Sequence, residues 1–309
     1  MINKKEKIYS NCEICDQKNF SFFTNLINLR VPDRNFPISI CKNCGFVTMW
    51  PKPNFNDYKE INTQWYKVKF SLERPGINNE SIFKRWEVMW DRVGRFIKDN
   101  QNLDFLDVGS GQGLSIQFLK SKIENLNATA IEQWPDCQKH IKEKLNSKVV
   151  DVDIDGIWPE SLHGKFDFII LRHTLEHLMN PAQTLTQIEK CLKPNGLAYI
   201  VVPNLITNKF NRNLRTDFFR PVHLHYFTID HFEYFVNRYK MTPIILNNED
   251  EIWGLFKKGF KDMNLQNHHN QNLNYLNKWK KKVFFSDYKM IAKIYLKKIF
   301  SNYFKKNEI

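Results

Sequence analysis

The chain has 309 residues, of which 42% are hydrophobic, 14% aromatic and 26% charged, which is enough for a sizeable core and excludes global disorder. No window approaches the roughly 18 apolar residues that a membrane helix needs, and no apolar stretch follows the first charged residues, so we expect neither a spanning nor a secreted protein. The net charge is +13, but residues 278–309 hold ten Lys against two acids, so the charge does not identify the whole chain as a nucleic-acid binder.

Four of the six cysteines form two CxxC pairs, Cys12 with Cys15 and Cys41 with Cys44. Two residues between thiolates let both sulfurs face one tetrahedral ion about 2.3 Å away, so the pairs predict a zinc site. Two disulfides are the alternative, and they would require a secreted protein. Because sulfur fills all four positions, the zinc would be structural. We therefore expect a zinc-ribbon-like lobe over residues 1–60, which serves as a folding clip or binds a partner.

The next segments lead into a larger domain. Residues 61–79 show no sustained periodicity, which predicts a linker. From Glu80 to Asn100, apolar residues recur at the three- and four-residue spacing of an amphipathic helix. We place the main domain at residues 80–263 and a basic helical tail at residues 264–309.

A strand, a glycine turn and a helix follow in that order. The apolar run Leu103–Val108 precedes Gly109-Ser110-Gly111-Gln112-Gly113, and Leu114 to Lys120 has a helical pattern. Such a turn brings the backbone close to a ligand and presents the amino end of the helix to it. A dinucleotide fingerprint would need glycine where Leu114 stands, which disfavours NAD.

Acids at the ends of the next two strands suit an adenosine. The strand Ala128–Ile131 ends at Glu132, where a carboxylate can accept both ribose hydroxyls. The strand Lys148–Val152 ends near Asp153, which is placed to accept the adenine amino group while the backbone at Ile154 lies by the ring. Asp151 is the competing acid at this position.

Later segments complete a doubly wound α/β sheet. Lys165–Leu171 is a nearly continuous apolar run, as in a parallel strand covered on both faces. Leu197–Val202 predicts a fifth strand, and Lys240–Asn247 and Glu251–Lys258 predict the last two.

Together, in this order, these segments resemble the class I S-adenosylmethionine-dependent methyltransferases over roughly Glu80 to Glu251. The resemblance is carried by the glycine turn, Glu132, the strand Phe166 to Leu171, the block from Leu175 to Pro181 and the turn from Leu192 to Gly196. It implies a Rossmann-like seven-stranded sheet with its last strand antiparallel and S-adenosylmethionine at the carboxyl ends of the first strands. The implied cofactor-binding residues are Asp107, Gly109, Ser110, Gly111, Gly113, Glu132, Asp153, Ile154 and Arg172, of which Arg172 would lie near the methionine carboxylate or is simply exposed.

A narrower resemblance is to bacterial sugar methyltransferases with an amino-terminal zinc-binding lobe. It rests on the segment from Cys41 to Gly45, followed by Pro51 and Pro53. It implies a cytoplasmic enzyme that methylates a sugar or nucleotide-sugar/glycan precursor in surface polysaccharide synthesis. Because C-methylating members carry a further large domain, we expect O-methylation. The alternatives are RNA, which no Asn-Pro-Pro-Tyr block supports, another small molecule, or a non-catalytic scaffold; the oligomeric state stays open.

A hydroxyl acceptor needs a base, and histidine suits this role because its pKa lies near working pH. His173 and His177 follow the fourth strand four residues apart, and the pair Glu176-His177 either takes part in chemistry or shapes the loop. The segment from Arg220 to Thr228 resembles the acceptor-side block of the family. It makes His223, His225 and Tyr226 further candidates for base or acceptor contact, with packing as the alternative.

Two basic features remain. Arg212, Arg215 and Arg220 would bind phosphate or lie in a solvated loop. The tail from Tyr275 alternates aromatic and Lys residues in a basic amphipathic pattern. It would lie on an anionic inner-membrane surface, bind a partner or pack on the enzyme body.

Overall fold

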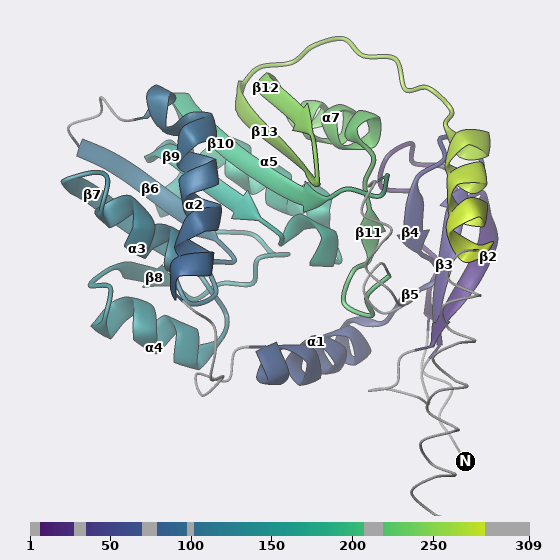
Figure 1. The fold of residues 1–309 in the computed structure, drawn as a ribbon, viewed down its shortest axis with the longest axis horizontal. Coiled ribbons are helices and arrows are strands. Elements are labelled where there is room, and N and C mark those ends of the chain that lie inside the picture. The colour runs from purple at the N-terminus through teal and green to yellow at the C-terminus, as the bar shows by residue number, and fades with distance from the viewer. Residues whose placement is uncertain (1–6, 28–34, 70–78, 98–101, 207–218, 282–309) are drawn as a thin grey trace, which may run out of the picture.

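The computed structural model describes residues 7–27, 35–69, 79–97, 102–206 and 219–281 (Figure 1). Its main sheet has seven strands in the order β12-β13-β10-β9-β6-β7-β8, and β13 runs antiparallel to both of its neighbours. This confirms the predicted Rossmann-like sheet with an antiparallel last strand. The strands are β6 Asn102–Val108, β7 Asn125–Ile131, β8 Lys148–Val150, β9 Phe166–Arg172, β10 Leu192–Pro203, β12 Met241–Asn248 and β13 Glu251–Lys258.

Helices cover both faces of this sheet because neighbouring residues of its strands point to opposite sides. In β9, Phe168 packs with the helices of one face and Ile169 with those of the other. The first face carries α2 (Asn79–Val93), α3 (Leu114–Lys120) and α4 (Pro135–Glu143), and the second carries α5 (Pro181–Cys191) and α7 (Ile229–Arg238). Short 3₁₀ turns lie at Gly94–Phe96, Glu160–Leu162 and Leu175–His177.

The amino-terminal lobe shares a second sheet with the main domain. Its strand order is β11-β4-β3-β2, with β2 at Phe20–Ile27, β3 at Asn35–Cys41, β4 at Val47–Met49 and β11 at His225–Tyr226. β11 pairs antiparallel with β4, so that His225 lies opposite Thr48. A separate pair is formed by β1 (Lys7–Ile8) and β5 (Lys52–Pro53). The lobe is therefore joined to the main domain by backbone hydrogen bonds.

Helix α1 (Phe55–Lys69) extends into the segment predicted to be a linker, so residues 61–69 of that segment are helical. The Asn54 side chain accepts a hydrogen bond of 3.0 Å from the backbone N–H of Asp57 at the start of the helix. Tyr58 and Ile61 are buried in the core of the lobe. This buried stripe is too short to produce a sustained periodic pattern in the sequence.

The described part of the predicted tail is a helix over residues 269–281 that packs against the lobe (Figure 1). Leu276 and Trp279 are buried in the same apolar cluster as Phe219. Residues 282–309 lie outside the described residues, so contact of the tail with a membrane or partner stays a prediction. Within the described part of the chain, no helix is long and apolar enough to cross a membrane.

Candidate functional site

A cavity of about 1170 Å³ opens at the carboxyl ends of β6, β7 and β9, where the sequence placed the cofactor. The glycine turn after β6 forms one wall. Helix α1, helix α2 and the segments around residues 220–223 and 249–251 contribute the others. The cavity therefore joins parts of the chain that are far apart in the sequence.

The glycine turn has a backbone that favours glycine. Gly109, Gly111 and Gly113 have φ values of 73°, 54° and 70°. A Cβ on Gly109 would lie 2.6 Å from Oγ1 of Thr174, and Gly113 is the N-cap residue of α3. The turn can therefore present its backbone to a ligand at close range.

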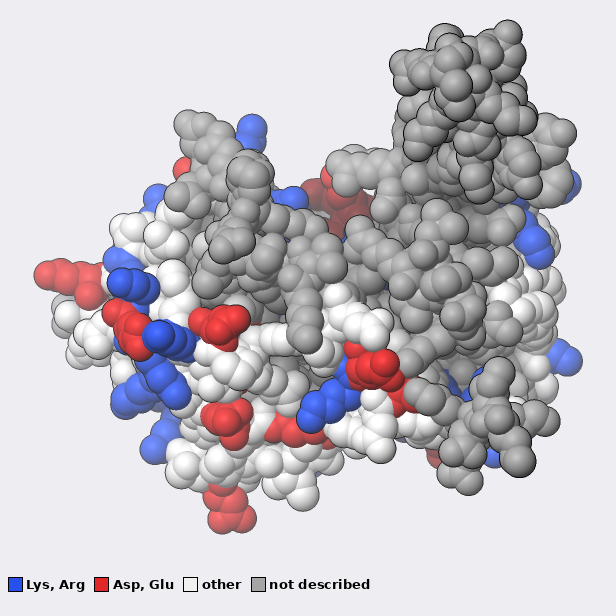
Figure 2. Space-filling view, turned by 90° about the horizontal axis from the view of Figure 1, so that it is seen from below, with Lys and Arg blue, Asp and Glu red and all other residues white. Residues whose placement is uncertain are grey.

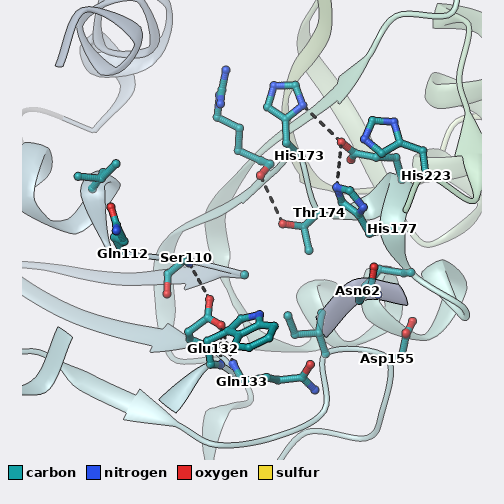
Figure 3. A pocket seen from close by; sticks show the side chains of 18 of the residues that line it. Asn62, Ser110, Gln112, Glu132, Gln133, Asp155, His173, Thr174, His177 and His223 are labelled. Atoms are coloured by element: carbon teal, nitrogen blue, oxygen red, sulfur yellow. Dashed lines mark hydrogen bonds and ion pairs between the residues drawn. The ribbon is translucent and has the colours of Figure 1, made fainter. Parts of the chain in front are cut away.

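Polar groups beside this turn fit the adenosine part of S-adenosylmethionine. The Oγ atom of Ser110 is buried on the cavity wall and has no hydrogen-bond partner among the described residues. Glu132 accepts backbone hydrogen bonds of 2.6 Å from Gly111, 2.8 Å from Gln133 and 2.9 Å from Trp134, while burial raises its pKa. Its carboxylate thus lies between the glycine turn and the end of β7, which is where a ribose would need it (Figure 3).

Two residues of the predicted set support the turn without lining the cavity. Asp107 is buried and accepts a hydrogen bond from the hydroxyl of Ser115. Burial raises the pKa of Asp107 to about 7. Asp107 and Gly113 do not line the cavity, so their direct contact with the cofactor stays a prediction.

The acids after β8 line the cavity together. Asp151, Asp153 and Ile154 all contribute to the wall, so the choice between the two acids for the adenine amino group stays open. Asp155 lies beside them and accepts backbone hydrogen bonds from Met179 and from the next residue. Burial raises the pKa of Asp155.

Arg172 lines the cavity at the end of β9, and its Nη2 atom is 2.9 Å from Oε2 of Glu251. Arg92 of α2 contacts the other oxygen of Glu251 at 3.2 Å. Burial alone would raise the pKa of Glu251, but His173, Arg172 and Arg92 lower it to about 2. Glu251 is thus an ionised carboxylate at the cavity edge, and a contact of Arg172 with the cofactor carboxylate stays a prediction.

His173 lies between two carboxylates on the same wall. Its Nε2 donates to Glu251 at 3.0 Å, and its Nδ1 is 3.4 Å from Oε1 of Glu176. Burial alone would lower the pKa of His173, but these carboxylates raise it. The backbone of His173 is left-handed with φ 51°, an uncommon conformation that recurs at functional sites.

His177 and His223 also line the cavity (Figure 3), and His177 contacts the same oxygen of Glu176 as His173 does. The ring of His177 donates from Nδ1 to the backbone oxygen of Val222 at 2.7 Å, which leaves Nε2 3.7 Å from Oε1 of Glu176. The rings of His177 and His223 meet edge to face with centroids 4.6 Å apart. Three of the five predicted catalytic residues, His173, His177 and His223, therefore share one wall.

The other two predicted catalytic residues, His225 and Tyr226, do not line the cavity. His225 is 1% exposed, its Nε2 lies 2.9 Å from the oxygen of Leu178, and burial holds its pKa well below the usual value. The hydroxyl of Tyr226 donates to Arg220, and burial raises its pKa above the usual range. Both are corrected to packing residues of β11, because the shared sheet turns them into the interior.

The four cysteines of the lobe form one cluster. The Sγ atoms of Cys12 and Cys44 are 3.6 Å apart, those of Cys15 and Cys41 are 3.5 Å apart, and all four lie within 4.8 Å of one another. A tetrahedral zinc ion with bonds of about 2.3 Å needs sulfurs about 3.8 Å apart, so the cluster has suitable dimensions. Gly45, directly after the second cysteine pair, has φ 85°, a conformation that favours glycine.

Several lining residues carry no sequence motif. Tyr58 and Asn62 come from α1, Trp86 from α2 and Glu251 from the start of β13. A polar helix next to the domain with the glycine turn would have pointed to Tyr58 and Asn62, but α1 was not predicted from the sequence. Arg220 lines the cavity, whereas Arg212 and Arg215 lie outside the described residues.

Comparisons with known proteins agree with this geometry. Residues 81–239 match the family model of a methyltransferase domain. The malonyl-[acyl-carrier protein] O-methyltransferase 2 of Ilyobacter polytropus is 28% identical over 114 residues, covering 35% of this chain and 43% of that protein. The ubiquinone biosynthesis O-methyltransferase of Rickettsia typhi is 25% identical over 158 residues, covering 50% of this chain and 61% of that protein. Each alignment thus spans less than two thirds of the relative.

A solved structure shows the same fold. The PH0226 protein of Pyrococcus horikoshii is 15% identical, with a TM-score of 0.50 over 63% of this chain and 98% of that one. At this identity the likeness concerns the fold alone.

Proposed function

The chain belongs to the S-adenosylmethionine-dependent methyltransferases, and we propose that it methylates a hydroxyl oxygen of a sugar or nucleotide-sugar precursor of a surface glycan. One observation carries this proposal. The cavity has the glycine turn and Glu132 on one side, and on the other it has the histidine group, which consists of His173, His177 and His223. S-adenosylmethionine, when bound, supplies a methyl group on a positively charged sulfur. The chain must then hold the acceptor oxygen in line and receive its proton.

We assign the base to His173. Glu251 accepts the hydrogen bond from Nε2 and orients the ring, and Glu176 lies 3.4 Å from Nδ1, so the two carboxylates favour the protonated ring that the reaction produces. As the C–O bond forms and the C–S bond breaks, the electron pair of that bond stays on sulfur and the hydroxyl proton passes to His173. Glu251 stabilises the resulting imidazolium.

The acceptor side of the cavity supports a polar, sugar-like molecule. Asn62 and Thr63 of α1 offer hydrogen-bonding groups, while Tyr58 and Trp86 offer aromatic surface. An apolar acceptor would need a more apolar pocket. Arg220, also on this wall, can pair with a phosphate of a nucleotide sugar.

The described part of the face in Figure 2 supports a small acceptor rather than RNA. In Figure 2, Lys and Arg side chains lie beside Asp and Glu over the described part of the face. RNA binding would favour a continuous basic surface. We place the reaction in the cytoplasm, a reducing compartment, because none of the six cysteines forms a disulfide in the described residues.

We further propose that Cys12, Cys15, Cys41 and Cys44 hold a structural zinc ion, supported by the sulfur spacing given above. With four sulfur ligands the ion has no open position, so its contribution is to fold the lobe. Metal analysis of the purified protein tests this with an expected content of one zinc per chain.

Calorimetric titration with S-adenosylhomocysteine is the first test of the enzyme assignment, with micromolar binding expected. Labelled S-adenosylmethionine and a panel of nucleotide sugars then test the acceptor. His173→Gln should retain affinity for S-adenosylhomocysteine and lose turnover, whereas the control His140→Gln on α4, outside the cavity lining, should retain both. Folded, zinc-loaded protein that fails to bind S-adenosylhomocysteine would contradict the enzyme assignment.

A further inference from the structure

Glu176 is a buried carboxylate whose environment the methyl-transfer reaction does not explain. The residue is 1% exposed, and its carboxylate makes ion-pair contacts with two imidazole rings. The two ring nitrogens in these contacts are Nδ1 of His173 at 3.4 Å and Nε2 of His177 at 3.7 Å. A buried carboxylate is costly unless it is paired or binds a metal.

A second histidine completes a compact set of ligand atoms. One carboxylate oxygen of Glu176 and one ring nitrogen each of His177 and His223 lie within 4.8 Å of one another. All three residues line the cavity, and Figure 3 shows His177 and His223 next to each other. Because Glu176 and His177 come from the turn after β9 and His223 from the segment before β11, the fold brings them together.

The orientation of His177 fits a metal ligand. Its Nδ1–H donates to the backbone oxygen of Val222 at 2.7 Å, so Nε2 points toward Glu176. Ligating histidines commonly donate their other ring N–H to a backbone carbonyl, which sets the tautomer and the direction of the ligating nitrogen. The hydroxyl of Tyr58 donates to the same Val222 oxygen at 2.6 Å and holds this carbonyl in place.

We infer that Glu176, His177 and His223 bind a divalent first-row transition metal ion on the acceptor side of the cavity. Two imidazoles and one carboxylate suit iron, cobalt, nickel or zinc better than magnesium, which prefers oxygen ligands. Three protein ligands leave positions open toward the cavity. The role of the ion rests on the proposed function and makes it more specific. The open coordination positions would hold the acceptor oxygen beside His173. His173 contacts Glu176 but is not one of the three ligands, so it is left to act as the base.

Cobalt(II) titration of protein that holds one zinc ion per chain tests this inference, because the cysteine cluster is then filled and the second site is empty. We expect one Co²⁺ per chain with visible d–d absorption and no thiolate charge-transfer band. His177→Gln and His223→Gln should each weaken Co²⁺ binding at least about tenfold, with the affinity for S-adenosylhomocysteine retained. The control His140→Gln should leave the Co²⁺ affinity unchanged.

Proton NMR of the Co²⁺-loaded wild type is a second test that needs no variant. Two histidine ligands predict two strongly shifted, exchangeable imidazole N–H signals. Absence of Co²⁺ uptake by protein that binds S-adenosylhomocysteine would overturn the metal site alone. Uptake that both histidine variants retain would overturn it as well, whereas loss of S-adenosylhomocysteine binding by the wild type would overturn the proposed function.

Discussion

Asp107 is expected to make the stability of the main domain depend on pH. Its carboxyl is buried beneath the glycine turn, and burial raises its pKa from 3.8 to about 7. In the folded chain the group therefore keeps its proton up to about pH 7, whereas in the unfolded chain it loses the proton near pH 4. The unfolded state thus binds fewer protons between these values, and the free energy of unfolding must fall as pH rises through this window.

The size of this effect follows from the shift. Each pH unit within the window is worth about 1.4 kcal/mol, so the contribution of Asp107 falls by about 2 kcal/mol between about pH 5.5 and about pH 8. Asp107→Asn cannot titrate, so its stability relative to wild type should rise by this amount over the same range. At roughly 2 °C per kcal/mol, the difference between the two melting temperatures should change by roughly 4 °C.

Thermal unfolding of both proteins across this pH range, followed by circular dichroism, measures the effect. Ser115→Ala keeps the carboxyl but removes the hydrogen bond that lowers its pKa, so the fall should extend to higher pH in this variant. Melting temperatures of wild type and Asp107→Asn that change in parallel with pH would refute the reasoning, because Asp107 would then titrate alike in both states.

Three further predictions concern the turn, the cavity wall and the lobe. Gly109→Ala adds a clash with the side chain of Thr174 to the strain of a positive φ. It should therefore lower the free energy of unfolding by at least about 1 kcal/mol more than Gly164→Ala, whose site has a similar positive φ but open space around it. In calorimetry, only Gly109→Ala should weaken S-adenosylhomocysteine binding. Tyr58→Phe removes the hydrogen bonds of the hydroxyl to two backbone carbonyls. It should lower the free energy of unfolding in denaturant by about 1–2 kcal/mol and lower kcat. Loss of cofactor affinity in this variant would contradict the placement of Tyr58 on the acceptor side. Cys41→Ser should remove the zinc ion and lower turnover at least about tenfold, while the cofactor affinity is retained. Full turnover by the zinc-free protein would show that folding of the lobe does not affect the acceptor side of the cavity.

The cofactor side of the site could be predicted because its signals are local. The glycines of the turn need a left-handed backbone, and the strand before them needs apolar residues, so both requirements appear within a few consecutive positions. Glu132 could be predicted for the same reason, since a parallel strand ends directly before it. The two CxxC pairs are local as well, and only their meeting in one cluster required the fold.

The acceptor side could not be predicted as fully because long-range contacts decide it. His223 and His225 are two residues apart and equally plausible as bases in the sequence. Pairing of β11 with β4 buries His225 and leaves His223 on the cavity wall. Glu251 starts a strand in the sequence, and its contact with His173 depends on the antiparallel insertion of β13 next to β10. Neither outcome has a signature in the residues nearby.

The lobe and the acceptor wall are mechanically coupled because they share hydrogen bonds. Thr48 of β4 donates to the oxygen of Leu224 at 2.8 Å, and the N–H of Leu224 donates to the oxygen of Glu176 at 2.8 Å. The backbone that carries Glu176 is thus held by the lobe in two steps. Glu132 and the glycine turn make no such contact with β4, since they are positioned by β6 and β7. Disorder of the lobe should therefore displace the histidine group while the cofactor half of the cavity keeps its shape, which is why cofactor affinity and turnover are expected to separate when zinc is lost.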